Sequence, residues 1–157
     1  TAHQDASRHI QFQLYRAIEE PGLGRIYDAP TDLQLSEVDV VQPDLLLVLY
    51  EHRGRVARKK LIGPPDLVVE ILSPSTAERD HDLKRTLYEQ RLVPEYWIVD
   101  VDEQTVSRYR PGDAHSYELV ETCRNQITYS AEPAGDRSQA IEASVDLETV
   151  WRRMSQY

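Results

Sequence analysis

Residues 64–75 read PPDLVVEILSPS, in which a single carboxylate, Glu70, stands inside an otherwise apolar run. Residues 42–50 read QPDLLLVLY, so Pro-Asp-Leu followed by apolar residues occurs twice. Apolar runs with almost no alternation are typical of central strands that are covered on both faces. The two runs therefore predict neighbouring central strands at residues 44–50 and 66–72.

Helical patterns lie on both sides of these runs. Apolar residues in the segment 4–20 recur every three or four positions, which predicts an amphipathic helix that ends at residues 21–22, Pro-Gly. A second helix is expected to begin at Ser75, because Glu78 follows it at capping-box spacing. Its expected buried stripe consists of Leu83, Leu87 and Tyr88.

The remaining segments complete an α/β pattern. Weak alternation predicts edge or half-buried strands at 24–30 and 31–38, and stronger signals predict strands at 95–101, 106–110 and 117–121 and a closing helix at 145–154. The polar segment 125–143 carries no clear pattern. This order of elements predicts an α/β fold with a central mixed β-sheet flanked by α-helices.

Length and composition favour one domain that spans residues 1–157. The chain begins with Thr rather than Met, which is consistent with a missing N-terminal segment. No apolar run approaches the ~20 residues that cross a bilayer, so no membrane association is expected. Cys123 is the single cysteine, which fits a reducing, cytoplasmic compartment.

The charge distribution is uneven. The net charge of −9 argues against a polyanionic partner, yet residues 53–60, RGRVARKK, hold five of the 18 basic residues and no acid. Two interpretations stay open: a solvated loop, or a DNA-binding loop. The basic side chains are Arg53, Arg55, Arg58, Lys59 and Lys60.

The two Pro-Asp phrases are not equivalent if the central strands pair in antiparallel fashion. The start of the first strand then lies beside the end of the second, which brings Asp44 close to Glu70, whereas Asp66 lies about 13 Å from Glu70 along its own strand. Two adjacent carboxylates repel each other unless a cation lies between them. Mg²⁺ is commonly held by one or two carboxylates and water, so this pair predicts a metal site.

A cation for the same site is available on the second helix. Lys84 lies on the helical row of Asp80, Lys84 and Tyr88, and this helix must fold back against the strand that carries Glu70. The alternative is a surface ion pair between Asp80 and Lys84 at i, i+4 spacing, worth only a few tenths of a kcal/mol.

Three phrases in fixed order, QPDLLLVL, PPDLVVEILSPST and RDHDLKRTLYEQRLVPEYWIVD, resemble the Uma family of putative restriction endonucleases. This family is a branch of the PD-(D/E)XK nuclease superfamily, and the resemblance covers about residues 1–110. It implies a restriction-endonuclease-like core and hydrolysis of phosphodiester bonds in DNA with Mg²⁺ or Mn²⁺. Nucleases of this superfamily frequently act as dimers, so a homodimer is also expected.

Carried over to this chain, the resemblance makes Asp44, Glu70 and Lys84 the catalytic residues. The metal ligands would be Asp44, Glu70 and the backbone carbonyl of Ile71. The lysine that the superfamily motif has two residues after its acid is replaced here by Leu72, and a lysine of the following helix, Lys84, takes its role. The alternative is a catalytically inactive nuclease-fold module that binds a partner.

Two features of the first helix bear on the same site. The superfamily often adds an acid from this helix, but Glu19 and Glu20 are expected to face solvent and are assigned no role. Family members often have a histidine where His3 stands. His3 is therefore either a site residue, or a cap or solvent-facing residue.

Overall fold

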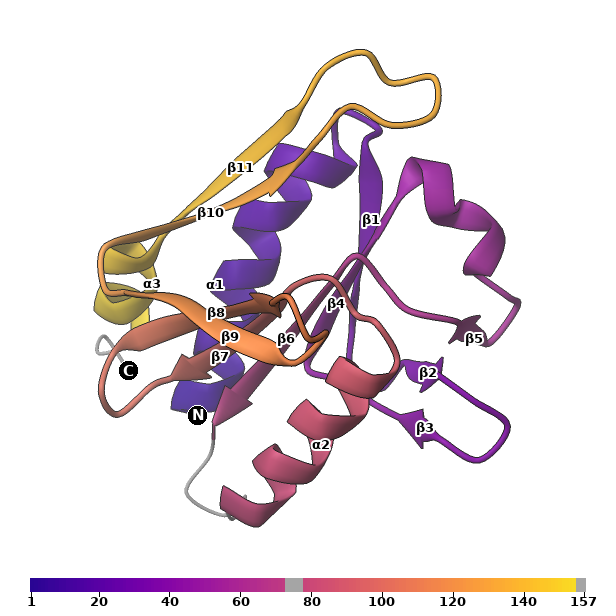
Figure 1. Cartoon of the computed structure of the whole chain (residues 1–157). Helices are drawn as coiled ribbons and strands as arrows, with labels where there is room; N and C mark the ends of the chain where they lie inside the picture. Colours follow the sequence, from indigo (N-terminus) through magenta and orange to yellow (C-terminus); the bar gives the residue numbers. More distant parts are fainter. Residues whose placement is uncertain (73–77, 155–157) are drawn as a thin grey trace.

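A six-stranded mixed sheet forms the centre of the computed structural model (Figure 1). The structure describes residues 1–72 and 78–154, with only the backbone described for 78–80. The strand order is β1-β4-β6-β7-β8-β9, with β6 and β7 parallel and the other pairs antiparallel. The strands are β1 (Gly24–Asp28), β4 (Leu45–Leu49), β6 (Leu67–Leu72), β7 (Tyr96–Asp100), β8 (Thr105–Pro111) and β9 (Tyr117–Cys123). The expected central mixed sheet is confirmed.

The two apolar runs are neighbours at the centre of this sheet. Leu45 of β4 faces Val69 of β6 and Leu47 faces Leu67, in the expected antiparallel register. All five residues of β4 and the first five of β6 are buried. Neighbouring elements cover both faces of these strands, which is why their sequences show no alternation.

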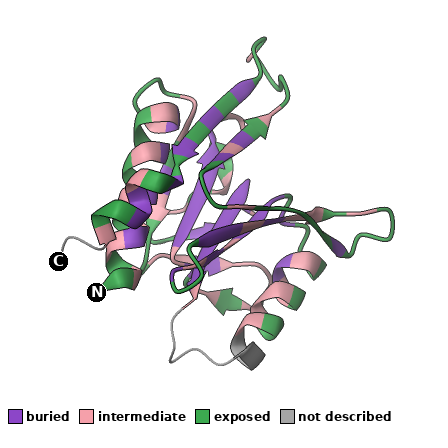
Figure 2. Ribbon diagram, turned by 90° about the vertical axis from the view of Figure 1, so that its left-hand side faces the viewer, coloured by how far each residue is buried: buried purple, intermediate pink, exposed green. Residues whose placement is uncertain are grey.

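Helices pack on opposite faces of the sheet. The helix α1 (Ala2–Leu14) begins with a capping box between Thr1 and Gln4, and π-helical residues Tyr15–Glu19 continue it. Its apolar stripe packs on the face that includes Leu47 and Val69, whereas Tyr88 of α2 (Glu78–Gln90) packs on the face that includes Val68. Figure 2 shows the buried strands between these two helical layers.

Two smaller sheets complete the fold. The hairpin of β10 (Gln126–Ala131) and β11 (Ile141–Asp146) lies in the segment without a clear sequence pattern, and alternate residues of β11 join the core beside α1. The other sheet has the order β3-β2-β5, with bounds β2 (Asp32–Gln34), β3 (Val40–Val41) and β5 (Lys60–Ile62). A 3₁₀ helix, η2 (Tyr50–Arg55), connects β4 to this sheet.

The helices differ in two respects from those predicted from the sequence, and one further prediction lies outside the described residues. Leu83 is 62% exposed and is not part of the buried stripe of α2, whereas Leu87 is half-buried and Tyr88 is fully buried. The closing helix α3 is shorter than predicted, Leu147–Met154, since residues 145 and 146 extend β11. The expected cap at Ser75 lies outside the described residues.

Asp66, from the second Pro-Asp phrase, holds the far end of the β4–β6 pair. Its buried carboxylate accepts a hydrogen bond from the Leu49 amide at 2.8 Å and contacts His52 Nδ1 at 2.8 Å. The backbone amide of Asp66 donates to the Leu47 carbonyl at 2.8 Å. Asp66 is therefore a structural residue that joins β4 to the start of β6.

We predict that Asp66→Ala lowers the free energy of unfolding by about 1–3 kcal/mol, because the Leu49 amide stays buried without its acceptor. Urea unfolding measures the change, and Asp113→Ala in the exposed β8–β9 turn is the matched control. Equal stability of the two variants would contradict this role of Asp66.

Candidate active site

Asp44 and Glu70 meet at the opposite end of the β4–β6 pair. Asp44 immediately precedes β4, and its Oδ2 accepts a hydrogen bond from the Ile71 amide at 2.7 Å. The Asp44 amide in turn donates to Glu70 Oε1 at 3.3 Å. The two carboxylates are thus held together by reciprocal bonds across the strands, as the sequence predicted.

Glu70 is buried within the sheet and is approached from α2. Its side chain is 3% exposed, and its Oε2 lies 3.0 Å from Lys84 Nζ. The Tyr88 hydroxyl donates to Glu70 Oε1 at 3.3 Å. Lys84 and Tyr88 are one helical turn apart, so one row of α2 presents both groups to the carboxylate.

The environment of Glu70 favours its protonated form. Burial raises the pKa of Glu70 from its ordinary value of 4.5 to about 7; the Lys84 ammonium opposes this shift and the Asp44 carboxylate adds to it. Burial also raises the pKa of Tyr88, so its hydroxyl keeps its proton and remains a donor. A second cation beside Asp44 and Glu70 would stabilise the charged carboxylate.

Asp44 also opens toward α1. Its side chain is 21% exposed and lines a cavity of about 450 Å³ with His3, Arg8 and Asp28. His3 Nε2 lies 3.4 Å from Asp44 Oδ1, whereas the helix cap is Thr1. His3 therefore contacts the acidic pair, which sequence reasoning left undecided.

The donor set fits a hard divalent cation. Among the side chains that the structure describes, no group of three or more His, Cys, Asp and Glu residues forms a metal site, so the described donor set centres on the two carboxylates. Two carboxylates completed by water and substrate oxygens are a usual arrangement for Mg²⁺. Ile71 contacts Asp44 through its amide, and a role for its carbonyl stays a prediction.

Other predicted residues lie elsewhere. Leu72, at the position of the motif lysine, is half-buried at the end of β6. Glu19 was expected to face solvent, but it is half-buried and accepts a hydrogen bond from the Ile26 amide at 3.0 Å. The Asp80 side chain lies outside the described residues, so its pairing with Lys84 stays untested.

Sequence reasoning missed Tyr88 as a partner of Glu70 and assigned it to the core. It is fully buried, but its hydroxyl is directed to the carboxylate. The i, i+4 spacing of Lys84 and Tyr88 was the available signal, because two residues on one helical row approach the same point.

Comparisons with known proteins agree with this fold. The chain belongs to the Uma2 family, described as "Putative restriction endonuclease", whose model matches residues 1–142. A crystal structure from Anabaena variabilis ATCC 29413, titled as a putative nuclease belonging to DUF820, is similar with a TM-score of 0.70 and 16% sequence identity. The match covers 98% of this chain and 82% of that chain. No curated protein gives a significant match.

We predict that the metal-free protein loses stability as the pH rises from about 4.5 to 7, because folded Glu70 retains a proton that the unfolded chain releases. Glu70→Gln should remove this dependence, which amounts to about 3 kcal/mol for a shift of this size. Urea unfolding with chelator at pH 4.5 and pH 8 measures it.

Asp113→Asn, at an exposed position, is the control for this comparison. Added Mg²⁺ or Mn²⁺ should raise the melting temperature of the wild-type protein at pH 8 more than that of Glu70→Gln. The same pH dependence in wild type and Glu70→Gln would show that the burial of Glu70 carries no such cost.

Proposed function

We propose that this protein is a metal-dependent nuclease that hydrolyses phosphodiester bonds of DNA. The supporting observation is the contact of Asp44 and Glu70 across adjacent strands, with Lys84 Nζ 3.0 Å from Glu70 despite the missing motif lysine. Membership of a family described as "Putative restriction endonuclease" points to the same class of reaction.

Asp44 and Glu70 are the proposed ligands of Mg²⁺ or Mn²⁺, together with the Ile71 carbonyl. A cation bound there would polarise the phosphodiester and lower the pKa of a bound water molecule. Asp44 lines the cavity beside α1 and its side chain is 21% exposed, so solvent and substrate can reach it.

Lys84 is the proposed catalytic cation. Its ammonium lies 3.0 Å from Glu70 Oε2, and its side chain is 27% exposed. From that position it can orient the attacking water and stabilise the charge that develops on the phosphoryl oxygens. Tyr88 donates to Glu70 and thereby fixes the carboxylate that Lys84 contacts.

We predict that Asp44→Asn and Glu70→Gln each reduce DNA cleavage about a hundredfold or more, because each removes a proposed metal ligand. Lys84→Gln should reduce cleavage while leaving Mn²⁺ binding intact. Supercoiled and single-stranded DNA incubated with Mg²⁺ or Mn²⁺ provides the assay.

Asp113→Asn is the matched control, chelator should abolish cleavage, and circular dichroism verifies folding of each variant. Cleavage that persists at the wild-type rate in both Asp44→Asn and Glu70→Gln would refute the assignment.

The second candidate function is a catalytically inactive module that retains the nuclease fold and binds a partner. Leu72 at the motif position and the net charge of −9 favour it. Calorimetry distinguishes the candidates, since a folded protein that binds no Mn²⁺ near neutral pH supports the module.

No helix among the described residues has the length and apolar character needed to span a membrane. A single domain over residues 1–157, a homodimer and a cytoplasmic location stay predictions.

A further inference from the structure

Two adjoining cavities form a groove beside β1. One has a volume of about 380 Å³ and the other about 300 Å³, and both are lined by Arg25, Tyr27 and Val56. The described lining of the two cavities includes no Asp or Glu. Its basic residues are Arg25, Arg53, Arg58, Lys59 and Lys60.

The concentration of positive charge in this groove is unusual for the chain. The protein has 27 acidic and 18 basic residues, so a random patch of this surface would carry acids. Arg25 comes from β1, far in sequence from the basic loop, and the fold adds it to Arg58 and Lys59. Arg55 is directed elsewhere, because its Nη1 donates to the Pro64 carbonyl at 2.7 Å. The groove therefore has the charge that a polyanion would require, and its basic residues differ from the set read from the sequence.

Two tyrosine rings of the groove lie against its cations. The Arg53 guanidinium lies 3.9 Å from the centre of the Tyr50 ring, and that of Arg25 lies 5.2 Å from the Tyr27 ring. The Tyr50 side chain belongs to a residue that is 57% exposed. Rings that stand among cations in this way can stack with unpaired bases, whereas the bases of a duplex are hidden.

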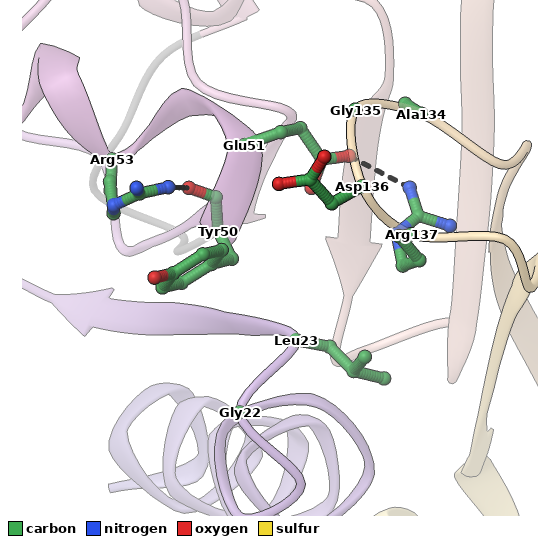
Figure 3. Close-up of a pocket in the computed structure, with 9 residues that line it drawn as sticks. All are labelled: Gly22, Leu23, Tyr50, Glu51, Arg53, Ala134, Gly135, Asp136 and Arg137. Carbon is green, nitrogen blue, oxygen red and sulfur yellow. Dashed lines mark hydrogen bonds and ion pairs between the residues drawn. The ribbon is translucent and has the colours of Figure 1, made fainter.

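One end of the groove lies at the hairpin between β10 and β11. Figure 3 shows Tyr50 and Arg53 of η2 on one side of a cavity of about 320 Å³, with Glu51 and Arg137 paired on the other. The Arg137 Nη2 atom lies 2.7 Å from Glu51 Oε1. No described acidic residue lines the groove itself, and Glu51 is an acidic residue beyond this end.

The other end of the groove leads toward the acidic pair. Arg25 faces Val48 across β1 and β4, and Leu46 faces Val68 across β4 and β6, so the groove and Glu70 share one face of the sheet. Residues 28–31 separate the groove from the cavity of Asp44: Pro30 and Thr31 line the former, and Asp28 and Ala29 line the latter.

We infer that this groove binds a single strand of nucleic acid and directs it over residues 28–31 to Asp44 and Glu70. Arg25, Arg58 and Lys59 contact phosphates, and the rings of Tyr27 and Tyr50 stack with bases. The inference rests on the proposed function, because it identifies a single strand of nucleic acid as the substrate on which the acidic pair acts. Binding in the groove itself requires neither metal nor cleavage.

The test measures binding of a fluorescently labelled thymidine 20-mer to the full chain by anisotropy, in chelator, over a series of salt concentrations. Replacing Arg25, Arg58 and Lys59 together by Ala should weaken binding at least tenfold and reduce the salt slope by about two, since single strands lose about 0.7 per phosphate contact. Replacing Arg16, Arg124 and Arg153 by Ala is the control with the same change in net charge. Equal effects of the two triple variants would refute binding of the 20-mer in the groove.

The tyrosines separate a single strand from a duplex. Tyr50→Leu should weaken binding of the 20-mer about fivefold or more and leave duplex binding unchanged, while Tyr50→Phe should retain wild-type affinity. Leu keeps an apolar side chain at this exposed position, and thermal melting verifies that each variant folds. Equal losses for 20-mer and duplex, or none for either, would overturn the stacking role.

The outcomes also distinguish this inference from the nuclease proposal. Groove-dependent binding of the 20-mer in a protein that cleaves no DNA would support the groove and refute the nuclease. Cleavage that is sensitive to Asp44→Asn, but unaffected by the groove variants, would support the nuclease and overturn the groove.

Discussion

The antiparallel pairing of β4 with β6 is the constraint on which the site depends. It brings the residue before β4 beside the end of β6, so that the Ile71 amide reaches the Asp44 carboxylate and the Asp44 amide reaches Glu70. A shift of one residue would move Glu70 to the other face of the sheet and away from Lys84 and Tyr88. Hydrogen bonds at both ends of the pair specify this register, because a shift would break the bonds from the Ile71 amide to Asp44 and from the Leu49 amide to Asp66.

The repeated Pro-Asp phrase has opposite roles at the two ends of this pair. The Asp66 carboxylate accepts a hydrogen bond from the Leu49 amide and contacts His52, so its charge has local partners within the protein. The charged form of Glu70 costs free energy in the folded protein, because burial raises its pKa to about 7 in spite of Lys84. One end of the strand pair therefore stabilises the fold, while the other holds a buried carboxylate with a raised pKa.

Charge is separated along the same face of the sheet. The acidic pair lies at one place, and the groove beside β1 gathers cations without acids in a chain of net charge −9. A polyanion attracted to the groove would be repelled by most of the remaining surface. In the proposed nuclease, this separation would restrict the path of the substrate to the one that ends at Asp44 and Glu70.

The amino-acid sequence by itself determined the two central strands, because apolar runs are local properties. It placed Asp44 beside Glu70 on the condition that these strands pair in antiparallel fashion, and the structure supplied that pairing. It also located Lys84, since a helix that follows a buried strand must return across it. Only the tertiary structure decided that His3 contacts Asp44, that Tyr88 donates to Glu70, that Leu83 is exposed and that Arg25 joins the basic loop. These features depend on how elements distant in sequence pack against each other, and no periodicity within a single segment records that packing.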